Sequence, residues 1–221
     1  MGFGSSNTAS RCRCQFNWLD WLDFGLAQTY GRVHHTINAG VGGDTTRGLL
    51  RRFDEDVALY RPHLVFITIG GNDANPENDI SDREFVRNLS TLAERVQALD
   101  CACLIFQTYY SADIEKMDPR YGRNFLDFMD VTRRVAPTSG GILVDHHRRW
   151  ERLRKHCTAE YRQLMEDPLH VNPQGNMLMG LDLLRLFEAT PPPPQRQYLA
   201  EGLKYQQLCD RLEEESSDPG N

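Results

Sequence analysis

The feature that most constrains the fold is the apolar run LVFITI at residues 64–69. Arg61-Pro62 precede this run and Gly70-Gly71 follow it, so turn-forming residues bound it on both sides. A nearly continuous run of β-branched and aromatic side chains is typical of a strand that is covered on both faces, as in parallel sheets. The chain is therefore expected to form a parallel sheet whose strands are joined by helices.

Weaker signals repeat this alternation along the chain. Helices are expected over residues 16–30, 46–57, 81–99, 124–135, 148–165 (surface-exposed) and 175–187, and strands over 33–39, 64–69, 103–107 and 141–145. Residues 1–3 are a stub of one more strand, and residues 108–123 are expected to be irregular. Strand and helix in alternation predict an α/β fold, a three-layer α/β/α sandwich around a mostly parallel sheet.

The chain of 221 residues is long enough for one domain with a sizeable core. Four prolines at 191–194 end the alternating pattern and are expected to act as a stiff spacer. An amphipathic piece with leucines at 199, 203, 208 and 212 follows, and then an acidic end. Residues 1–190 are therefore assigned to one domain and residues 191–221 to a spacer and tail. The helical piece is expected to pack on the domain or on a second copy.

The charge pattern and apolar runs exclude several classes of partner. The net charge is −6 and no basic stripe stands out, which argues against nucleic acid. No apolar run approaches the ~20 residues of a membrane span, and the N-terminus lacks a secretory-signal pattern. The six cysteines have no zinc-type spacing, and reduced thiols are expected. These features favour a cytoplasmic protein.

Polar residues gather in the turns where a catalytic site of a parallel sheet is expected. Such sites lie beyond the carboxyl ends of the strands, and the turns at Gly4, Gly43 and Gly70 and the loop at His170 all fall there. In the last of these, Asp167 stands three residues before His170 and can accept a hydrogen bond from its Nδ1–H. That bond would fix the tautomer in which Nε2 faces outward as a base.

Each of these turns also has a purely structural interpretation. Residues 5–7 and residues 72–73 could cap the helices that follow, and Gly43 could be only a turn glycine. Asp73 is given a structural role, because its carboxylate has no evident step to perform. The sequence Asp-His-His at 145–147 suggests a metal site, but adjacent side chains diverge, so these are interpreted as surface histidines. No metal or other cofactor is expected.

Four blocks of sequence together resemble the signature of the SGNH hydrolases, the superfamily of GDSL-type esterases and acylhydrolases. In chain order these blocks are GSSNT at 4–8, NAGVGGDTT at 38–46, GGND at 70–73 and DPLH at 167–170. The resemblance covers about residues 3–187 and implies the flavodoxin-like fold of that superfamily. It also implies a serine ester hydrolase that works through an acyl-enzyme.

The resemblance further implies a role for each matching residue. Ser6 matches the nucleophile, His170 the base and acid, and Asp167 the residue that orients the imidazole. The oxyanion hole would combine the backbone N–H groups of Ser6 and Gly43 with the side-chain amide of Asn72. These parts suit acyl transfer, because a serine hydroxyl is a poor nucleophile until a base takes its proton. Each oxyanion donor contributes about 2.7–4 kcal/mol of barrier lowering.

The sequence departs from the superfamily pattern at two places. Ser5 stands where Asp is usual, and the strand before the first block is reduced to residues 1–3. Either the sheet tolerates a very short strand, or the chain begins upstream and could then carry a signal sequence.

Three hypotheses of function are kept. The leading one is hydrolysis of acetyl-type esters of small molecules or carbohydrates, because no insertion is large enough for a lid. Acyl transfer by the same residues and an inactive binding domain are the alternatives. A monomer or small homo-oligomer is expected.

Overall fold

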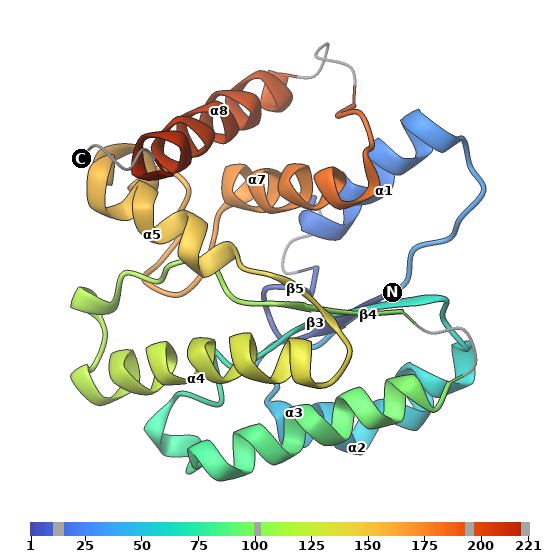
Figure 1. Cartoon of the computed structure of the whole chain (residues 1–221). Helices are drawn as coiled ribbons and strands as arrows, with labels where there is room; N and C mark the ends of the chain where they lie inside the picture. The colour runs from blue at the N-terminus through green and yellow to red at the C-terminus, as the bar shows by residue number, and fades with distance from the viewer. Residues whose placement is uncertain (11–15, 100–102, 193–196, 218–221) are drawn as a thin grey trace.

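The computed structural model describes residues 1–10, 16–99, 103–192 and 197–217. At its centre is a five-stranded sheet in which neighbouring strands are all parallel, in the order β2-β1-β3-β4-β5 (Figure 1). The strands are β1 (Gly2–Gly4), β2 (Asn38–Gly40), β3 (Leu64–Thr68), β4 (Cys103–Gln107) and β5 (Ile142–Val144). The run at 64–69 therefore forms the middle strand, and the predicted parallel sheet is confirmed.

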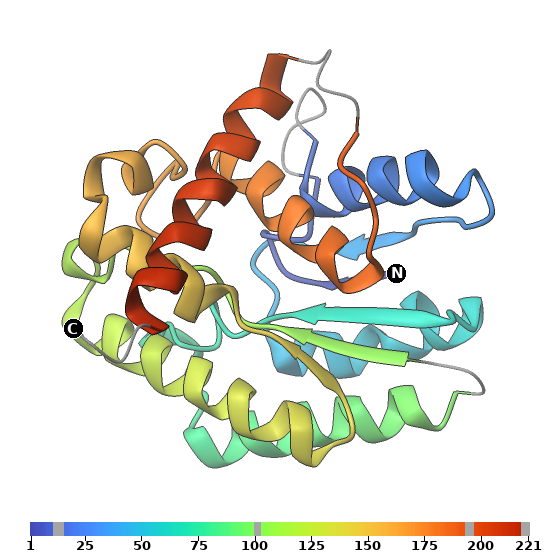
Figure 2. The same cartoon turned by 45° about the horizontal axis from the view of Figure 1, so that its top comes forward.

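Helices cover both faces of the sheet (Figures 1 and 2). On one face lie α2 (Thr46–Asp56), α3 (Asp82–Gln97) and α4 (Pro119–Thr138), and on the other α1 (Trp18–Tyr30) and α7 (Pro173–Leu184). The remaining helices are α5 (His146–His156), α6 (Thr158–Arg162) and α8 (Gln197–Ser217), with short 3₁₀ turns at Ala58–Tyr60, Pro76–Asn78, Ile114–Lys116 and Arg185–Phe187. This arrangement confirms the predicted α/β/α sandwich.

β1 is only three residues long, yet it pairs with a strand on each side. Gly4, its last residue, lies opposite Gly40 of β2 and Thr68 of β3. A Cβ on Gly4 would lie 2.4 Å from the carbonyl oxygen of Thr68, and a Cβ on Gly40 would lie 2.2 Å from the backbone nitrogen of Ala9. These glycines let the chain after β1 pass closely over the strand ends, and the sheet accommodates the short strand.

α4 begins earlier than predicted, and the reason is in its first residues. Asp118 accepts hydrogen bonds from the backbone N–H groups of Arg120 and Tyr121, at 2.9 and 3.1 Å, and Pro119 occupies the first helical position. An Asp cap followed by Pro is a helix-start signal, since the proline ring fixes a helical φ where no N–H is needed. The expectation that residues 108–123 are irregular is therefore wrong for 119–123.

Two further sequence predictions are wrong. Residues 33–37 form no strand, and Val33 is 80% exposed. Of this segment, Ile37 packs against the core, and its carbonyl accepts a hydrogen bond from the N–H of Gly2 at 2.9 Å. The segment 148–165 is helical but not surface-exposed, since Trp150, Leu153 and Tyr161 of α5 and α6 are buried. The many charged residues of this segment led to the prediction of an exposed helix. Several of them form ion pairs instead, as Arg149 does with Asp182 and Arg154 with Glu151, so the high charge does not prevent burial of the helix.

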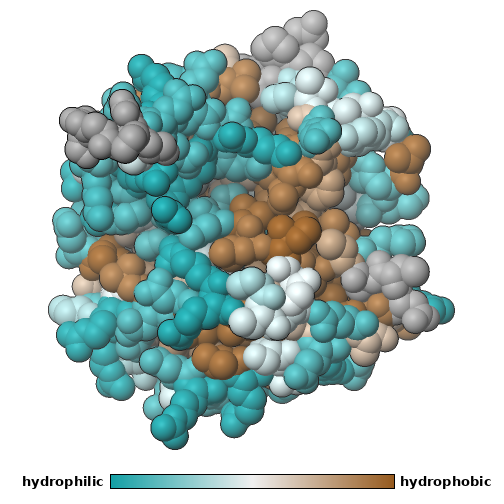
Figure 3. Space-filling model, viewed as in Figure 1, coloured by the Kyte–Doolittle hydropathy of each residue, from teal (hydrophilic) through white to brown (hydrophobic). Residues whose placement is uncertain are grey.

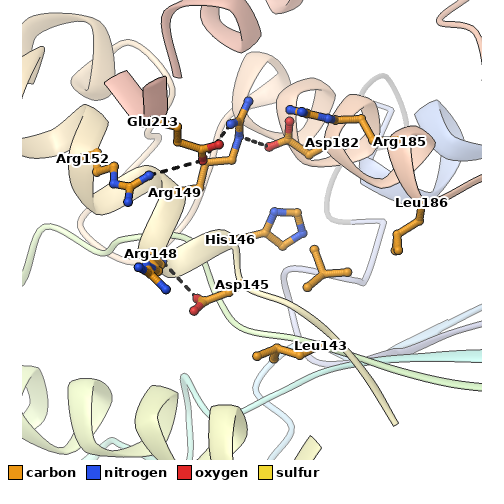
Figure 4. A pocket seen from close by; sticks show the side chains of 11 residues that line it. Leu143, Asp145, His146, Arg148, Arg149, Arg152, Asp182, Arg185, Leu186 and Glu213 are labelled. Carbon is orange, nitrogen blue, oxygen red and sulfur yellow. Dashed lines mark hydrogen bonds and ion pairs between the residues drawn. The ribbon is translucent and has the colours of Figure 1, made fainter. Parts of the chain in front are cut away.

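Apolar side chains gather over α7 and the β5 edge of the sheet, on the face that Figure 3 shows. Ile142 of β5 and Leu186, just after α7, are large apolar side chains that are 44% and 42% exposed. A cavity of about 530 Å³ lies beside this area, and Leu143 and Leu186 line its apolar side (Figure 4). The residues named as catalytic candidates do not line it.

The polar side of this cavity ties α8 to the domain. Arg149 of α5 donates from Nε to Asp182 of α7 at 3.0 Å and from an Nη to Asp210 of α8 at 2.8 Å. Its other Nη lies 2.9 Å from Glu213 of α8 (Figure 4). α8 therefore packs on the domain in this chain, which is one of the two arrangements expected for the helical piece. The division into residues 1–190 and 191–221 stays a prediction.

Replacement of Arg149 by methionine is expected to lower the free energy of unfolding by about 3 kcal/mol, because it leaves the carboxylate of Asp182 buried without its counter-charge. Arg185→Met is the matched control: Arg185 also pairs with Asp210, but its side chain is 56% exposed. A loss of less than about 1 kcal/mol is expected there. Urea unfolding measures both, and equal losses in the two variants would contradict this account.

Some sequence predictions fall outside the described residues. These are Cys12, Cys14 and Cys101, the last two prolines of the spacer and residues 218–221. Cys103, Cys157 and Cys209 are free thiols. Among the helices of the described ranges, none combines the length and hydrophobicity needed to cross a bilayer.

Candidate functional site

The Ser6 turn (residues 4–8) follows β1 and is tightly closed. The carbonyl oxygen of Ser5 accepts hydrogen bonds from the backbone N–H groups of Thr8 and Ala9, at 3.0 and 2.9 Å. Val41, just beyond β2, donates its N–H to the carbonyl of Gly4 at 3.0 Å. Ser6 is therefore held at the carboxyl end of the central strands, and its side chain is only partly buried.

The His170 loop (residues 166–170) is closed by its own hydrogen bonds. One carboxylate oxygen of Asp167 accepts from the N–H groups of Leu169 and His170, at 2.8 and 2.7 Å, and the other lies 2.7 Å from His170 Nδ1. Partial burial would raise the pKa of Asp167, but these hydrogen bonds together lower it. Asp167 is therefore held as a carboxylate that accepts from Nδ1–H, which leaves Nε2 as the basic nitrogen.

The structure brings the Ser6 turn and the His170 loop together. Ser6 Oγ lies 2.9 Å from His170 Nε2, although 164 positions separate the two residues in the chain. With Asp167 at Nδ1, the three side chains form a continuous hydrogen-bonded series. This geometry allows a proton to pass from the hydroxyl to the ring.

Ser5, the other hydroxyl of the turn, points away from His170. Its side chain is fully buried, and its Oγ lies 2.5 Å from the hydroxyl of Tyr109. A hydroxyl in that position is accessible neither to a substrate nor to the imidazole. The unusual serine at this position is therefore accommodated by a buried tyrosine.

The other oxyanion candidates also lie on turns at the carboxyl ends of strands. Gly43 has a φ of +78°, a conformation that favours glycine, and a Cβ there would meet open space. Asn72 donates from its side-chain amide to the carbonyl of Asp44 at 2.8 Å, which places it beside the loop that carries Gly43. The next helix, α3, is capped by Ser81. The suggestion that residues 72–73 merely cap α3 is therefore wrong.

Asp73 joins the turn at Asn72 to the start of α2. One of its carboxylate oxygens accepts from the backbone N–H of Thr46 at 2.8 Å and from the Thr46 hydroxyl at 2.6 Å. Asn88 of α3 in turn donates to that hydroxyl at 2.9 Å. Burial raises the pKa of Asp73 to about 6, although the two hydrogen bonds from Thr46 oppose the shift.

The raised pKa predicts a pH dependence of stability. Because the folded-state pKa lies above the unfolded value of 3.8, the contribution of Asp73 is full below about pH 4 and is lost as the pH rises through about 6. Asp73→Asn keeps an oxygen for Thr46 but carries no charge. Between pH 4 and pH 7, the free energy of unfolding of Asp73→Asn should therefore rise by up to about 3 kcal/mol relative to that of the wild type. Urea unfolding at both pH values measures this, and a difference that does not change with pH would contradict it.

Arg52 is a residue of the candidate site that no sequence pattern singles out. It donates to the carbonyl of Gly4 at the end of β1, at 3.0 Å, and to the carbonyl of Ala39 in β2, at 2.8 Å. Its Nε donates to Asp44, next to Gly43, at 2.7 Å. One guanidinium therefore joins two strand ends and the Gly43 loop. Arg51 precedes it in the same run of basic residues but is exposed, so no local signal separates the two.

His146 and His147 are buried, so the expectation of surface histidines is wrong. His146 Nε2 lies 3.0 Å from Gln107 Oε1, and His147 Nδ1 lies 3.0 Å from Arg133. Burial lowers the pKa of His146 to about 3 and that of His147 to about 4. The partner of His146 belongs to β4, and His147 lies against Arg133 and Phe125 of α4, so contacts from distant elements bury both rings. Within the described ranges, no group of three or more His, Cys, Asp or Glu side chains is placed to hold a metal.

Comparisons with known proteins identify the family to which the chain is similar. The profile of the "GDSL-like Lipase/Acylhydrolase family" matches residues 3–178. The chain is 37% identical to the uncharacterized lipoprotein YqeF of Bacillus subtilis over 82 residues, 34% of this chain and 31% of that protein. It is 28% identical to the esterase TesA of Pseudomonas aeruginosa over 128 residues, 58% of this chain and 59% of that protein. The chain thus spans less than two thirds of either relative.

A third relative has a solved structure. The acetylxylan esterase of Geobacillus stearothermophilus is 26% identical over 163 residues, 67% of this chain and 70% of that protein. Its crystal structure matches with a TM-score of 0.70 at 23% identity, over 83% of this chain and 91% of that one. At that identity the match shows the fold.

Proposed function

The chain belongs to the GDSL-like lipase/acylhydrolase family, within the SGNH hydrolases, and from this premise we propose that it hydrolyses carboxylic esters through an acyl-enzyme on Ser6. The observation that carries the proposal is the hydrogen-bonded series from Ser6 Oγ to His170 Nε2, at 2.9 Å, and from His170 Nδ1 to Asp167, at 2.7 Å. Ser6 is the nucleophile, His170 the base and acid, and Asp167 the residue that fixes the tautomer.

In the acylation step, Ser6 Oγ attacks the carbonyl carbon of the ester while His170 Nε2 takes the hydroxyl proton. The tetrahedral intermediate then collapses, the bond to the alcohol oxygen breaks, and the leaving alcohol takes that proton from the imidazolium. A water molecule next gives a proton to His170 and attacks the acyl carbon. The carboxylic acid leaves, and the proton returns from His170 to Ser6 Oγ.

Charge on the carbonyl oxygen needs donors that are already aimed at it. We assign this role to the backbone N–H groups of Ser6 and Gly43 and to the side-chain amide of Asn72. Asn72 supports the assignment because one of its amide hydrogens is used by Asp44, which fixes the plane of the amide and leaves the second hydrogen for an oxyanion.

Short acyl groups, of the acetyl type, suit the site best. The connections that carry Gly43 and Asn72 run only from Gly40 to Thr46 and from Thr68 to Pro76, which leaves little chain to build a tunnel for a long acyl chain. The acetylxylan esterase among the relatives supports the same substrate class, and a carbohydrate or other small alcohol as leaving group. An active enzyme is favoured over an inactive binding domain because the unusual Ser5 has a buried hydrogen-bond partner, Tyr109. The serine at this position is therefore no sign that the first block has lost its function.

Hydrolysis of a series of p-nitrophenyl esters, from acetate to octanoate, tests the proposal. We expect kcat/KM to be highest for the acetate and to fall with chain length. A maximum at octanoate would overturn the acyl preference. Absence of hydrolysis across the series by folded protein would overturn the esterase assignment. Ester products that form with an added sugar acceptor would indicate transfer rather than hydrolysis.

A further inference from the structure

Two consecutive tyrosines follow β4 at the base of the proposed site. The tyrosine pair (Tyr109 and Tyr110) is almost fully buried, with 1% and 0% of each residue exposed. Tyr109 packs edge-to-face on Phe125, and Tyr110 packs against Trp150. Both rings are therefore held in the core, while both hydroxyls reach toward the turns above the strand ends.

The hydroxyl of Tyr110 links the Ser6 turn to the His170 loop. It donates to the side-chain oxygen of Asn7, at 2.6 Å, or to the carbonyl of Leu169, and it accepts from the N–H of Val171 at 3.1 Å. Asn7 is the residue after Ser6, and Leu169 is the residue before His170. One buried oxygen atom thus contacts the immediate neighbours of both residues whose side chains lie 2.9 Å apart.

Tyr109 contacts the other side of the Ser6 turn. Its hydroxyl lies 2.5 Å from Ser5 Oγ, and Ser5 is the residue before Ser6. Tyr109 also packs against the backbone of Gly71, because a Cβ on that glycine would lie 2.7 to 2.9 Å from its ring and hydroxyl. Gly71 is the residue before Asn72. The two neighbours of Ser6 are therefore each held by one tyrosine. Tyr110 also contacts the neighbour of His170, and Tyr109 the neighbour of Asn72.

We propose that the tyrosine pair is the positioning element that holds Ser6 in register with His170 on one side and Asn72 on the other. The proposal rests on the proposed function, because it assigns the contacts of that same site. The tyrosines do not touch the reacting atoms and are not catalytic residues. Burial raises the pKa of Tyr109 to about 12 and that of Tyr110 well above its usual value, so both hydroxyls stay protonated at neutral pH and act as fixed hydrogen-bonding groups.

Buried tyrosines often serve stability alone, and a matched control separates the two roles. Tyr161 is 1% exposed and donates its hydroxyl to the carbonyl of Ser111 at 2.8 Å, but among the described residues its hydroxyl makes no hydrogen bond to the Ser6 turn or the His170 loop. Tyr161→Phe should therefore cost stability as Tyr110→Phe does. Only Tyr110→Phe should change the distance between Ser6 and His170.

The test compares wild type, Tyr110→Phe, Tyr109→Phe and Tyr161→Phe by the rate of labelling with a fluorophosphonate, by kcat and KM for p-nitrophenyl acetate, and by Tm. We expect Tyr110→Phe to lower the labelling rate and kcat by about 10- to 100-fold with KM nearly unchanged, since a displacement of about 1 Å costs rates of that order. Tyr109→Phe should lower kcat by up to about tenfold, as Ser5→Ala should, because both variants remove the same hydrogen bond. Tyr161→Phe should lower Tm but keep both rates within about twofold of the wild type.

A second readout does not depend on turnover. The proton on His170 Nδ1, bonded to Asp167, is expected to give a downfield ¹H resonance that is absent in His170→Asn and shifted or broadened in Tyr110→Phe, but unchanged in Tyr161→Phe. Rates in Tyr110→Phe within twofold of the wild type, or equal losses in Tyr161→Phe, would overturn the positioning role. If the wild type shows the downfield resonance but is not labelled by the fluorophosphonate, the proposed function is overturned instead. The positioning role would then still be decided by whether the resonance shifts or broadens in Tyr110→Phe.

Discussion

Replacement of Ser6 by alanine is expected to lower kcat for p-nitrophenyl acetate by at least about 1000-fold, while the protein stays folded. The reason is chemical: no other hydroxyl of the turn contacts the imidazole, whereas Ser6 Oγ lies 2.9 Å from His170 Nε2. The side chain of Ser6 is only partly buried and caps no helix, so its removal should leave stability within about 1 kcal/mol of the wild type. Steady-state kinetics and urea unfolding measure the two effects.

Ser5→Ala is the matched control for Ser6→Ala. It removes the neighbouring hydroxyl, which is fully buried against Tyr109 and has no access to substrate. The loss of a buried partner should cost about 1 to 3 kcal/mol of stability. Activity should stay within about tenfold of the wild type, because the turn loosens but the nucleophile remains. Abolition of activity by Ser5→Ala with activity retained in Ser6→Ala would reverse the assignment of the nucleophile.

Asp167→Asn is expected to lower kcat by about 10⁴-fold with little change in the fold. The two backbone N–H groups of Leu169 and His170 both donate to the same oxygen of Asp167, so an asparagine would turn its carbonyl oxygen toward them. Its NH₂ would then face His170 Nδ1 and force that nitrogen to accept. The proton would move to Nε2, where it would point at Ser6 and leave no base.

Asp118→Asn provides a control for the backbone part of this change. Asp118 also accepts two backbone N–H groups with one oxygen, those of Arg120 and Tyr121, but no histidine contacts its carboxylate. Its replacement should leave kcat within about twofold of the wild type, since asparagine caps helices as well as aspartate does. A kcat for Asp167→Asn as high as that of Asp118→Asn would show that the carboxylate does not set the tautomer.

The central features of the fold could be predicted from short, local patterns. The apolar run at 64–69 and the glycine turns after it predicted a buried parallel strand because nothing outside the strand is needed to recognise it. The burial of α5 could not be predicted in the same way. Arg149 belongs to a highly charged segment, which by itself predicts exposure. Its partners are carboxylates of α7 and α8, far away in the chain, and no local sequence pattern identifies them.

The residues of the candidate site also fall into those that local patterns predict and those that they do not. The turns of Ser6, Gly43 and Asn72 could be placed together because all parallel strands end at one edge of the sheet. The His170 loop follows α6 rather than a strand, so the strand-end argument does not account for its place beside Ser6. What sequence reasoning missed are the residues that align those turns: Arg52 and the tyrosine pair. The contact of Arg52 with Gly4 reaches across 48 positions in the chain and that of Tyr109 with Ser5 across 104, and these side chains are of types that occur throughout it. Two consecutive tyrosines, one residue beyond a buried strand, were the one available signal.

The central claim is that Ser6 is the residue that becomes acylated, and mass spectrometry of the fluorophosphonate-treated protein tests it most directly. We expect the intact wild-type chain to gain the mass of a single phosphonyl group, and peptide mapping to place that group on Ser6. His170→Asn should gain none in the same time. An adduct on Ser5 or on any other residue, or folded wild-type protein that gains no mass, would contradict the account.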